Sequence, residues 1–253
     1  MFGEHRISPL TRAAINLLVG RECYRFTREE RRALARTITL DRTFELPTDA
    51  IGYAVRGKRR HHNVVYFDDA KLPIQPFEAH PTFVFIDEII RQGKGYKETA
   101  LYADMHRGRR LWRQTGSEGE KARIELGSDQ QFDLYYARCF RLAESIQKHG
   151  VLDLRSSEAA GFRERDAFED NLSVGINERG EFVHYRRGKH RLAIAKVLGV
   201  RLVPATGVFV SGKYLRKEIP IWKTLLPGRL PSAISAVLDE TERKAWQKAD
   251  PFS

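Results

Sequence analysis

The hydrophobic pattern of the chain changes its period between residues 130 and 185, and this change constrains the fold more than any other feature. Over Gln130–His149, apolar residues recur at intervals of three and four, as on one face of an amphipathic helix. Over Leu172–Asn177 and again over Glu181–Tyr185, apolar residues alternate with polar or small ones, as in strands. The turn-forming segment 177–180 joins the two runs into a predicted hairpin. The sequence therefore predicts an α+β fold with a small mixed sheet.

Most other segments with a clear start or stop signal are predicted to be helices. The predicted helices cover Pro9–Val19, Thr27–Thr37, Pro81–Gln92, Lys97–His106, a short segment that ends at Leu198, and Pro231–Lys248. Further strands are predicted at Val64–Phe67 and Leu202–Val210, the latter broken by Pro204. Three regions follow: a mainly helical N-terminal extension over 1–125, an α+β core over 126–218, and a C-terminal tail with an amphipathic helix over 219–253.

The charge balance points to an anionic partner. Lysine and arginine number 44 against 33 aspartate and glutamate residues, which gives a net charge of +11. Such a balance favours nucleic acid, a nucleotide, a sugar phosphate or an anionic lipid without choosing among them. The two cysteines cannot form a disulfide framework or a cysteine-rich zinc site, and we predict no structural metal. No apolar run has the roughly 18 residues of a spanning helix, and no secretory leader is recognisable, so a cytoplasmic protein is expected.

The segment Gly188-Lys189-His190-Arg191 carries the chemistry that the sequence predicts. It lies between a predicted strand and a predicted helix, and the start of a helix presents backbone N–H groups and a positive dipole to an anion. Gly188 allows a ligand to approach the backbone closely. Arg191 offers a fork of donors to phosphate oxygens, and Lys189 and His190 add further donors. The alternative is a basic helix start that meets only solvent.

Two motifs in this part of the chain carry a resemblance to a known family. One is the helix end LAESI at 142–146, followed by Gly150, and the other is GKHRLAIAKVLG at 188–199, followed by the segment VPA at 203–205. Their order and spacing resemble the ParB/sulfiredoxin superfamily over roughly residues 130–210. The resemblance implies a ParB/sulfiredoxin-like core that binds a nucleotide, with Gly188, His190 and Arg191 in contact with its phosphates.

Members of this superfamily act as CTP-dependent DNA clamps, as reductases of cysteine sulfinic acid, or as kinases of free serine. Lys189 stands where the reductases carry their catalytic cysteine, so reductase chemistry is not expected. One convincing helix follows Val210, too little for the helix-turn-helix domain of the clamps. A nucleotide-binding protein remains, with phosphoryl transfer to a small hydroxyl-bearing acceptor as its activity if it is an enzyme. The alternative is a ParB-like nucleic-acid-binding protein that uses the same basic surface on a phosphate backbone.

Phosphoryl transfer requires a base for the acceptor hydroxyl and, as a rule, Mg²⁺ beside the phosphates. The expected cofactors are therefore a nucleoside triphosphate or diphosphate, whose base the sequence does not name, and Mg²⁺. Asp153, which follows the Gly150 turn, is the first choice for the catalytic carboxylate, ahead of Glu144 and Asp170.

Four further basic residues are weaker candidates for anion binding: Arg186, Arg187, Lys58 and Arg59. The last two belong to a segment that matches G-x-x-x-x-G-K over Gly52–Lys58. Arg59 occupies the place of the Ser or Thr that binds Mg²⁺ in a phosphate-binding loop, and no apolar helix follows, so a true phosphate-binding loop is not predicted. A basic loop over Lys58–His62 that contacts an anionic partner is the remaining interpretation, with a solvated turn as its alternative.

Overall fold

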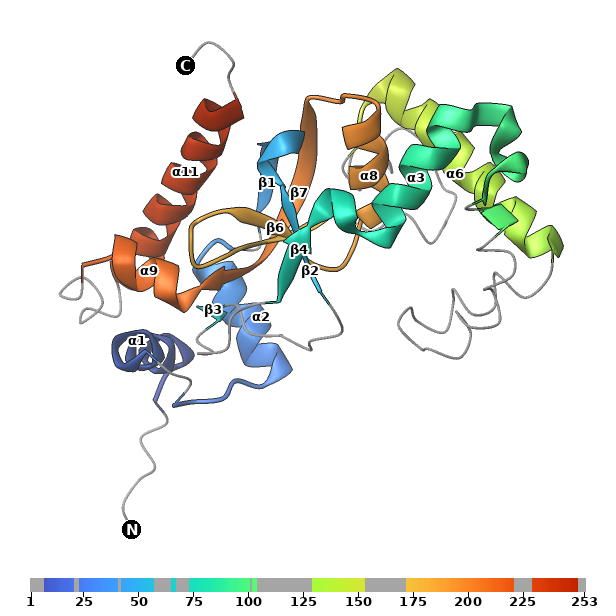
Figure 1. Cartoon of the computed structure of the whole chain (residues 1–253). Helices are drawn as coiled ribbons and strands as arrows, with labels where there is room; N and C mark the ends of the chain where they lie inside the picture. The colour runs from blue at the N-terminus through green and yellow to red at the C-terminus, as the bar shows by residue number, and fades with distance from the viewer. Residues whose placement is uncertain are drawn as a thin grey trace.

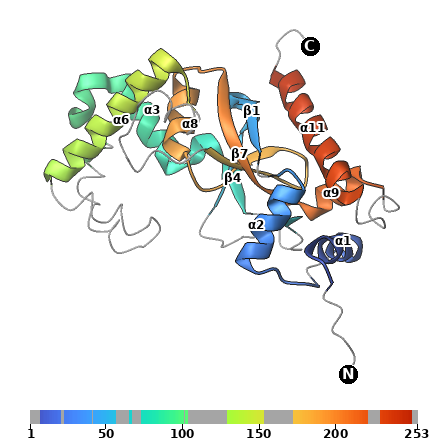
Figure 2. The ribbon, with the colours of Figure 1, turned by 180° about the vertical axis from the view of Figure 1, so that it is seen from behind.

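A computed structural model describes residues 7–20, 23–40, 42–56, 65–66, 73–100, 102–103, 129–152, 172–220 and 229–249. It confirms an α+β fold built on one mixed sheet of seven strands. Helices α3, α6 and α8 gather on one side of this sheet, and α1, α9 and α11 lie on the other side (Figures 1 and 2). The helices are α1 (Pro9–Val19), α2 (Arg28–Thr37), α3 (Pro81–Gln92), α6 (Asp129–His149), α8 (Lys189–Val197), α9 (Gly212–Glu218) and α11 (Leu230–Ala249).

Three of the seven strands in the described part of the chain pair with β7, namely β1, β3 and β5. They are β1 (Thr43–Pro47), β2 (Tyr53–Val55), β3 (Val65–Tyr66), β4 (Ile74–Pro76), β5 (Leu172–Ile176), β6 (Phe182–His184) and β7 (Leu202–Ser211). Their order is β1-β7-β5-β6-β2-β4, with β3 also paired to β7. The β5–β6 pair is antiparallel, which confirms the predicted hairpin, and β5 runs parallel to β7.

The sheet is not confined to the predicted core over 126–218. Strands β1 to β4 come from the N-terminal part of the chain, yet β1 pairs with β7 and β2 pairs with β6. Residues 43–76, within the predicted N-terminal extension, thus contribute four strands to the common sheet. Strand β3 lies within the strand predicted over Val64–Phe67. Strands β2 and β4 have three residues each, too few for a period of two to be recognised in the sequence.

Strand β7 continues through Pro204, contrary to the predicted break. Pro204 stands opposite Glu45 of β1. The backbone N–H and C=O of Glu45 both bond to side chains of α11, so they point away from β7. Pro204 and Glu45 therefore form a pair with no hydrogen bonds between them. Because no bond to β1 is expected from this position, the missing N–H of Pro204 does not weaken the pairing of β7 with β1. Pairing with β5 begins only at Ala205, one residue further on.

Helices predicted from capping residues and from apolar periodicity are present at the expected positions. Ser8 caps α1, and Thr27 with Glu30 forms the capping box of α2. The predicted apolar face of α6 is buried at Tyr136, Cys139, Ala143 and Ile146. The predicted helix over Lys97–His106 differs at its start, because Gly93–Glu98 forms the 3-10 helix η3. None of the described helices combines the length and apolar character that a bilayer crossing requires.

Helix α11 closes the open edge of β1. Glu242 accepts the backbone N–H of Glu45 at 3.2 Å, and the indole N–H of Trp246 donates to the Glu45 carbonyl at 3.1 Å. Arg42, just before the strand, also binds Glu242 at 3.2 Å and forms an ion pair with Asp239. Side chains one and two turns apart on one helix face thus take the place of a neighbouring strand, which protects the edge against pairing with other chains.

The close neighbours of Gly207 in β7 show that the centre of the sheet is tightly packed. A Cβ at this position would lie 2.4 Å from the Leu40 carbonyl oxygen and 2.8 Å from the Phe44 ring, and the backbone oxygen cannot rotate away. We expect Gly207→Ala to lower the free energy of unfolding by about 1–3 kcal/mol, which thermal denaturation will show as a lower Tm. Gly52→Ala is the matched control, because a Cβ there has no neighbour within 4 Å. Equal Tm values for both variants would contradict this packing.

Candidate functional site

Gly188 forms the joint between β6 and α8 for two structural reasons. Its backbone is left-handed, with φ of 76°, a conformation that side chains with a Cβ adopt only with strain. A Cβ at Gly188 would also lie 2.7 Å from the Cα of Leu172 in β5. The hairpin, the glycine and the helix therefore form the continuous strand–glycine–helix unit that the sequence predicts, with the start of α8 held against the first residue of β5.

The start of α8 has the backbone geometry of an anion site. The helix begins at Lys189, and no side chain caps it from the Gly188 position. The first turn of any α-helix directs its N–H groups outward along the helix axis, where the helix dipole is positive. Arg186 and Arg187 are exposed just before this turn, and Lys189 and Arg191 are half-buried within it. The structure thus brings together six of the predicted residues: Arg186, Arg187, Gly188, Lys189, His190 and Arg191.

Three other predicted residues cannot be placed relative to this turn. Asp153, Lys58 and Arg59 lie outside the described residues, as does Asp170. Glu144 is exposed on α6. The described residues therefore place the residues predicted to bind phosphate in one turn, and both phosphate binding and the catalytic carboxylate stay predictions.

His190 is fixed by a contact that sequence reasoning missed. Its Nε2 lies 2.7 Å from the hydroxyl of Tyr135 on α6, and the two rings meet edge to face. Tyr135 in turn stacks on Phe85 of α3, at 5.5 Å between ring centroids. Tyr135 is half-buried, and its hydroxyl links α6 to the start of α8.

A second histidine lies deeper beneath the same turn. His184, at the end of β6, is 3% exposed, and its Nε2 donates to the Arg187 carbonyl at 2.9 Å. Its ring meets Phe77 edge to face, and Phe77 stacks on His80, the N-cap of α3. His80 accepts the Thr82 N–H at Nδ1, 3.1 Å away. Residues 77–85 were therefore missed as neighbours of the site, because only the tertiary fold brings the start of α3 beside the start of α8.

Burial keeps both histidines of this turn neutral. Burial lowers the pKa of His184 from 6.5 to about 4 and that of His190 to about 3. The positive charge of Lys189 and the neighbouring His80 lower both pKa values further. The start of α8 is therefore electropositive through its backbone, lysine and arginines, while the imidazoles contribute hydrogen bonds and no charge at neutral pH.

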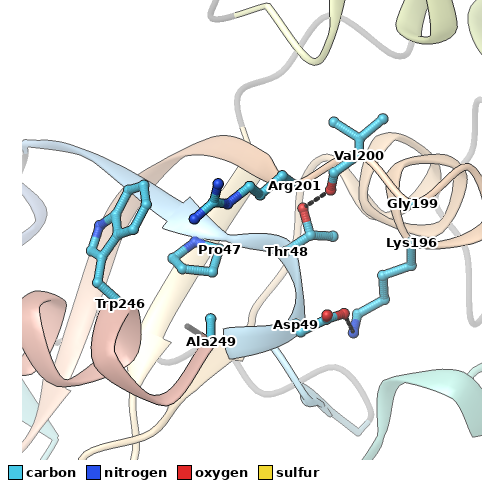
Figure 3. Close-up of a pocket in the computed structure, with 9 residues that line it drawn as sticks. All are labelled: Pro47, Thr48, Asp49, Lys196, Gly199, Val200, Arg201, Trp246 and Ala249. Carbon is cyan, nitrogen blue, oxygen red and sulfur yellow. Dashed lines mark hydrogen bonds and ion pairs between the residues drawn. The ribbon is translucent and has the colours of Figure 1, made fainter. Parts of the chain in front are cut away.

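The opposite end of α8 lines a hollow in the surface. The hollow lies between that helix end, the 3-10 turn η1 (Thr48–Ala50) and the last turns of α11 (Figure 3). It is lined by Pro47, Thr48, Asp49, Lys196, Gly199, Val200, Arg201, Trp246 and Ala249. None of the predicted site residues that the structure describes lines it, because these residues gather before and within the first turn of the helix.

Comparisons with known proteins assign no family to this arrangement. No family model matches the chain, no curated protein matches its sequence, and no solved structure matches it. Within the described ranges, no three histidine, cysteine or acidic side chains gather as ligands for a metal ion. The geometry of the α8 turn is therefore the feature from which a function can be inferred.

The buried histidines predict a pH dependence of stability. Because the pKa of His184 is lower in the folded chain, the unfolded chain binds more protons between pH 4 and 6.5. The contribution of His184 to the free energy of unfolding is then fully present above about pH 6.5. This contribution, on the order of 3 kcal/mol, is lost as the pH drops toward 4. Tm measured from about pH 7.5 to 4.5 should fall less steeply in His184→Gln, which keeps a donor for the Arg187 carbonyl. His149→Gln, at an exposed position, should follow the parent chain, and an unchanged slope in His184→Gln would contradict the assignment.

Proposed function

We propose that this chain is a nucleotide-binding protein of ParB/sulfiredoxin type, with the nucleotide phosphates at the start of α8. The observation that carries the proposal is the Gly188 joint: a helix that begins on a left-handed glycine, without a side-chain cap, among basic residues. Phosphate at a helix N-terminus gains both the backbone N–H groups and the helix dipole. The order of strand, glycine, helix and strand matches the motif on which the family resemblance rests.

The basic residues of the turn have different roles in this proposal. Arg191, in the first turn of α8, supplies the fork of donors that fits two phosphate oxygens. Lys189 supplies a single, more strongly hydrated charge, and the exposed Arg186 and Arg187 flank the approach. His190 is held by Tyr135 and is neutral, so it contributes at most one hydrogen bond and otherwise positions the helix start.

Phosphoryl transfer to a small hydroxyl-bearing acceptor is the activity that extends this proposal. Asp153 is the proposed base, on the strength of its sequence position after Gly150. Mg²⁺ usually binds one or two protein carboxylates together with the substrate phosphates. The described residues supply no carboxylate cluster for it. The ion would therefore be held mainly by the nucleotide, with Asp153 as the candidate protein ligand or base.

A nucleic-acid partner is the second candidate function, and the net charge of +11 is the observation that favours it. Phosphate-backbone binding releases counterions, so its affinity falls steeply with salt concentration. A nucleotide held in one phosphate site depends far less on salt and more on Mg²⁺. Titrations with a nucleotide and with single-stranded and duplex DNA at low and high salt therefore separate the two functions.

The nucleotide proposal predicts a graded loss of affinity at the α8 turn. ATP, ADP, CTP and GTP with Mg²⁺ are first screened by thermal shift, because a ligand at 100 times its Kd stabilises a protein by about 2.7 kcal/mol. Isothermal titration with the selected nucleotide should then show that Arg191→Ala weakens binding by about a hundredfold or more, since two charge-assisted hydrogen bonds are lost. His190→Ala should cost less, and Lys189→Ala least.

The exposed Arg179 in the β5–β6 turn offers a control of the same charge change, and Arg179→Ala should bind as the parent chain does. Circular dichroism should be unchanged in all variants, because the inner face of α8 is formed by Leu192, Ala193, Ile194 and Ala195. Parent-like affinity in a folded Arg191→Ala would move the phosphate site elsewhere, with Lys58–His62 as the next candidate. If no nucleotide binds the parent chain at any Mg²⁺ concentration, the nucleic-acid function replaces the nucleotide function.

A further inference from the structure

The hollow at the end of α8 has the size of a site for one small ring. Its volume is about 190 Å³. A protein cavity of about 150 Å³ is enough to bind benzene, whereas sites for drug-sized ligands begin near 300 Å³. Pro47, Val200 and Ala249 give the hollow an apolar lining between its charged residues (Figure 3). A single planar ring with one polar group therefore fits it, and a whole nucleotide does not.

Trp246 forms a fixed aromatic wall of this hollow. Its indole N–H donates to the Glu45 carbonyl at 3.1 Å, so the orientation of the ring is set by the edge of the sheet. The side chain is only half-buried, and it lies at one end of the hollow in Figure 3. An indole held in place in this way offers a face for stacking with little loss of side-chain entropy.

Arg201 supplies a guanidinium without a protein partner. The residue is exposed at the start of β7, and its side chain forms no hydrogen bond or ion pair within the described part of the chain. Its backbone carbonyl accepts the Thr48 N–H at 2.9 Å, which fixes the point from which the side chain extends. In Figure 3 the guanidinium extends toward the Trp246 side of the hollow. A planar fork of donors beside an aromatic wall fits a carboxylate in the plane of a ring.

The other charges that line the hollow are already balanced. Lys196, whose side chain is 8% exposed, lies 3.0 Å from Glu78 and 3.9 Å from Asp49. The last carbonyls of α8 also have partners, since Lys196 and Ala195 accept the N–H groups of Gly199 and Val200. Among the described residues that line the hollow, Arg201 is therefore the charge left over for a ligand.

We propose that this hollow binds a small aromatic carboxylate, with its ring against Trp246 and Pro47 and its carboxylate on Arg201. The site is separate from the phosphate site, because α8 is nine residues long and places its two ends about 13 Å apart. It does not rest on the proposed nucleotide binding, and each can fail without the other.

Benzoate and benzamide form the matched pair of probes, since they share a ring and differ in charge. The full-length chain labelled with nitrogen-15 is titrated with each, and the indole N–H resonance of Trp246, assigned by its loss in Trp246→Phe, is followed. We expect benzoate to shift this resonance with a dissociation constant on the order of 1 mM and benzamide to bind at least about tenfold more weakly.

Arg201→Gln should reduce benzoate affinity at least about tenfold and leave benzamide affinity unchanged, because only the carboxylate uses the guanidinium. Arg36→Gln, the same charge change at an exposed position on α2, should bind benzoate as the parent chain does. The Tm of each variant confirms that it is folded. No shift of the Trp246 resonance at about ten times the expected dissociation constant would overturn the proposal. Equal benzoate affinity in Arg201→Gln and the parent chain would overturn it as well.

Discussion

Strand β7 positions both ends of helix α8, and the two proposed sites therefore depend on its pairing. Its parallel register with β5 places Leu172, against which Gly188 packs at the start of the helix. Its antiparallel register with β1 places Pro47 opposite Leu202, beside the end of the same helix. The close approach of Gly207 to the Leu40 carbonyl holds the segment before β1 against the middle of β7. A shift of β7 by one residue would turn every side chain of β7 to the other face of the sheet and change all of these pairings.

The closed edge of the sheet and the hollow are consequences of one helix. Glu242 and Trp246 are four residues apart, so they project from the same face of α11 and reach the two backbone groups of Glu45. The ring that satisfies the Glu45 carbonyl is also the aromatic wall of the hollow. Substitution of Trp246 therefore affects the edge and the hollow together, whereas substitution of Arg201 leaves the edge bonds intact. Arg201 is for this reason the more specific residue with which to examine binding.

The sequence predicts this fold where the signals are local. The caps of α1 and α2, the apolar face of α6 and the β5–β6 hairpin all arise from residues close together in the chain, and all are confirmed. Strand β1 was missed although Phe44 and Leu46 alternate with Thr43 and Glu45, because the pattern covers only two periods before Pro47. Pro204 was interpreted as a break because its tolerance depends on a helix 26 or more residues later in the sequence, which no local pattern contains.

The candidate site likewise has one part that the local sequence predicts and another that depends on the tertiary fold. Its backbone part, a glycine between a strand and a helix, is a local arrangement and could be derived from four consecutive residues. The protonation state of His190 is not set by the local sequence alone, since its pKa depends mainly on burial by the tertiary fold and further on Lys189 and His80. From the sequence alone, a histidine in a basic segment could be taken for an additional positive charge near neutral pH. His190 is instead neutral near pH 7, because its pKa is lowered to about 3. In the proposed function, the attraction of the turn for phosphate therefore comes from its arginines, its lysine and the helix backbone. Because the pKa values of His184 and His190 lie at about 4 and about 3, the affinity of this turn for a phosphate should not vary with the titration of these histidines near neutral pH.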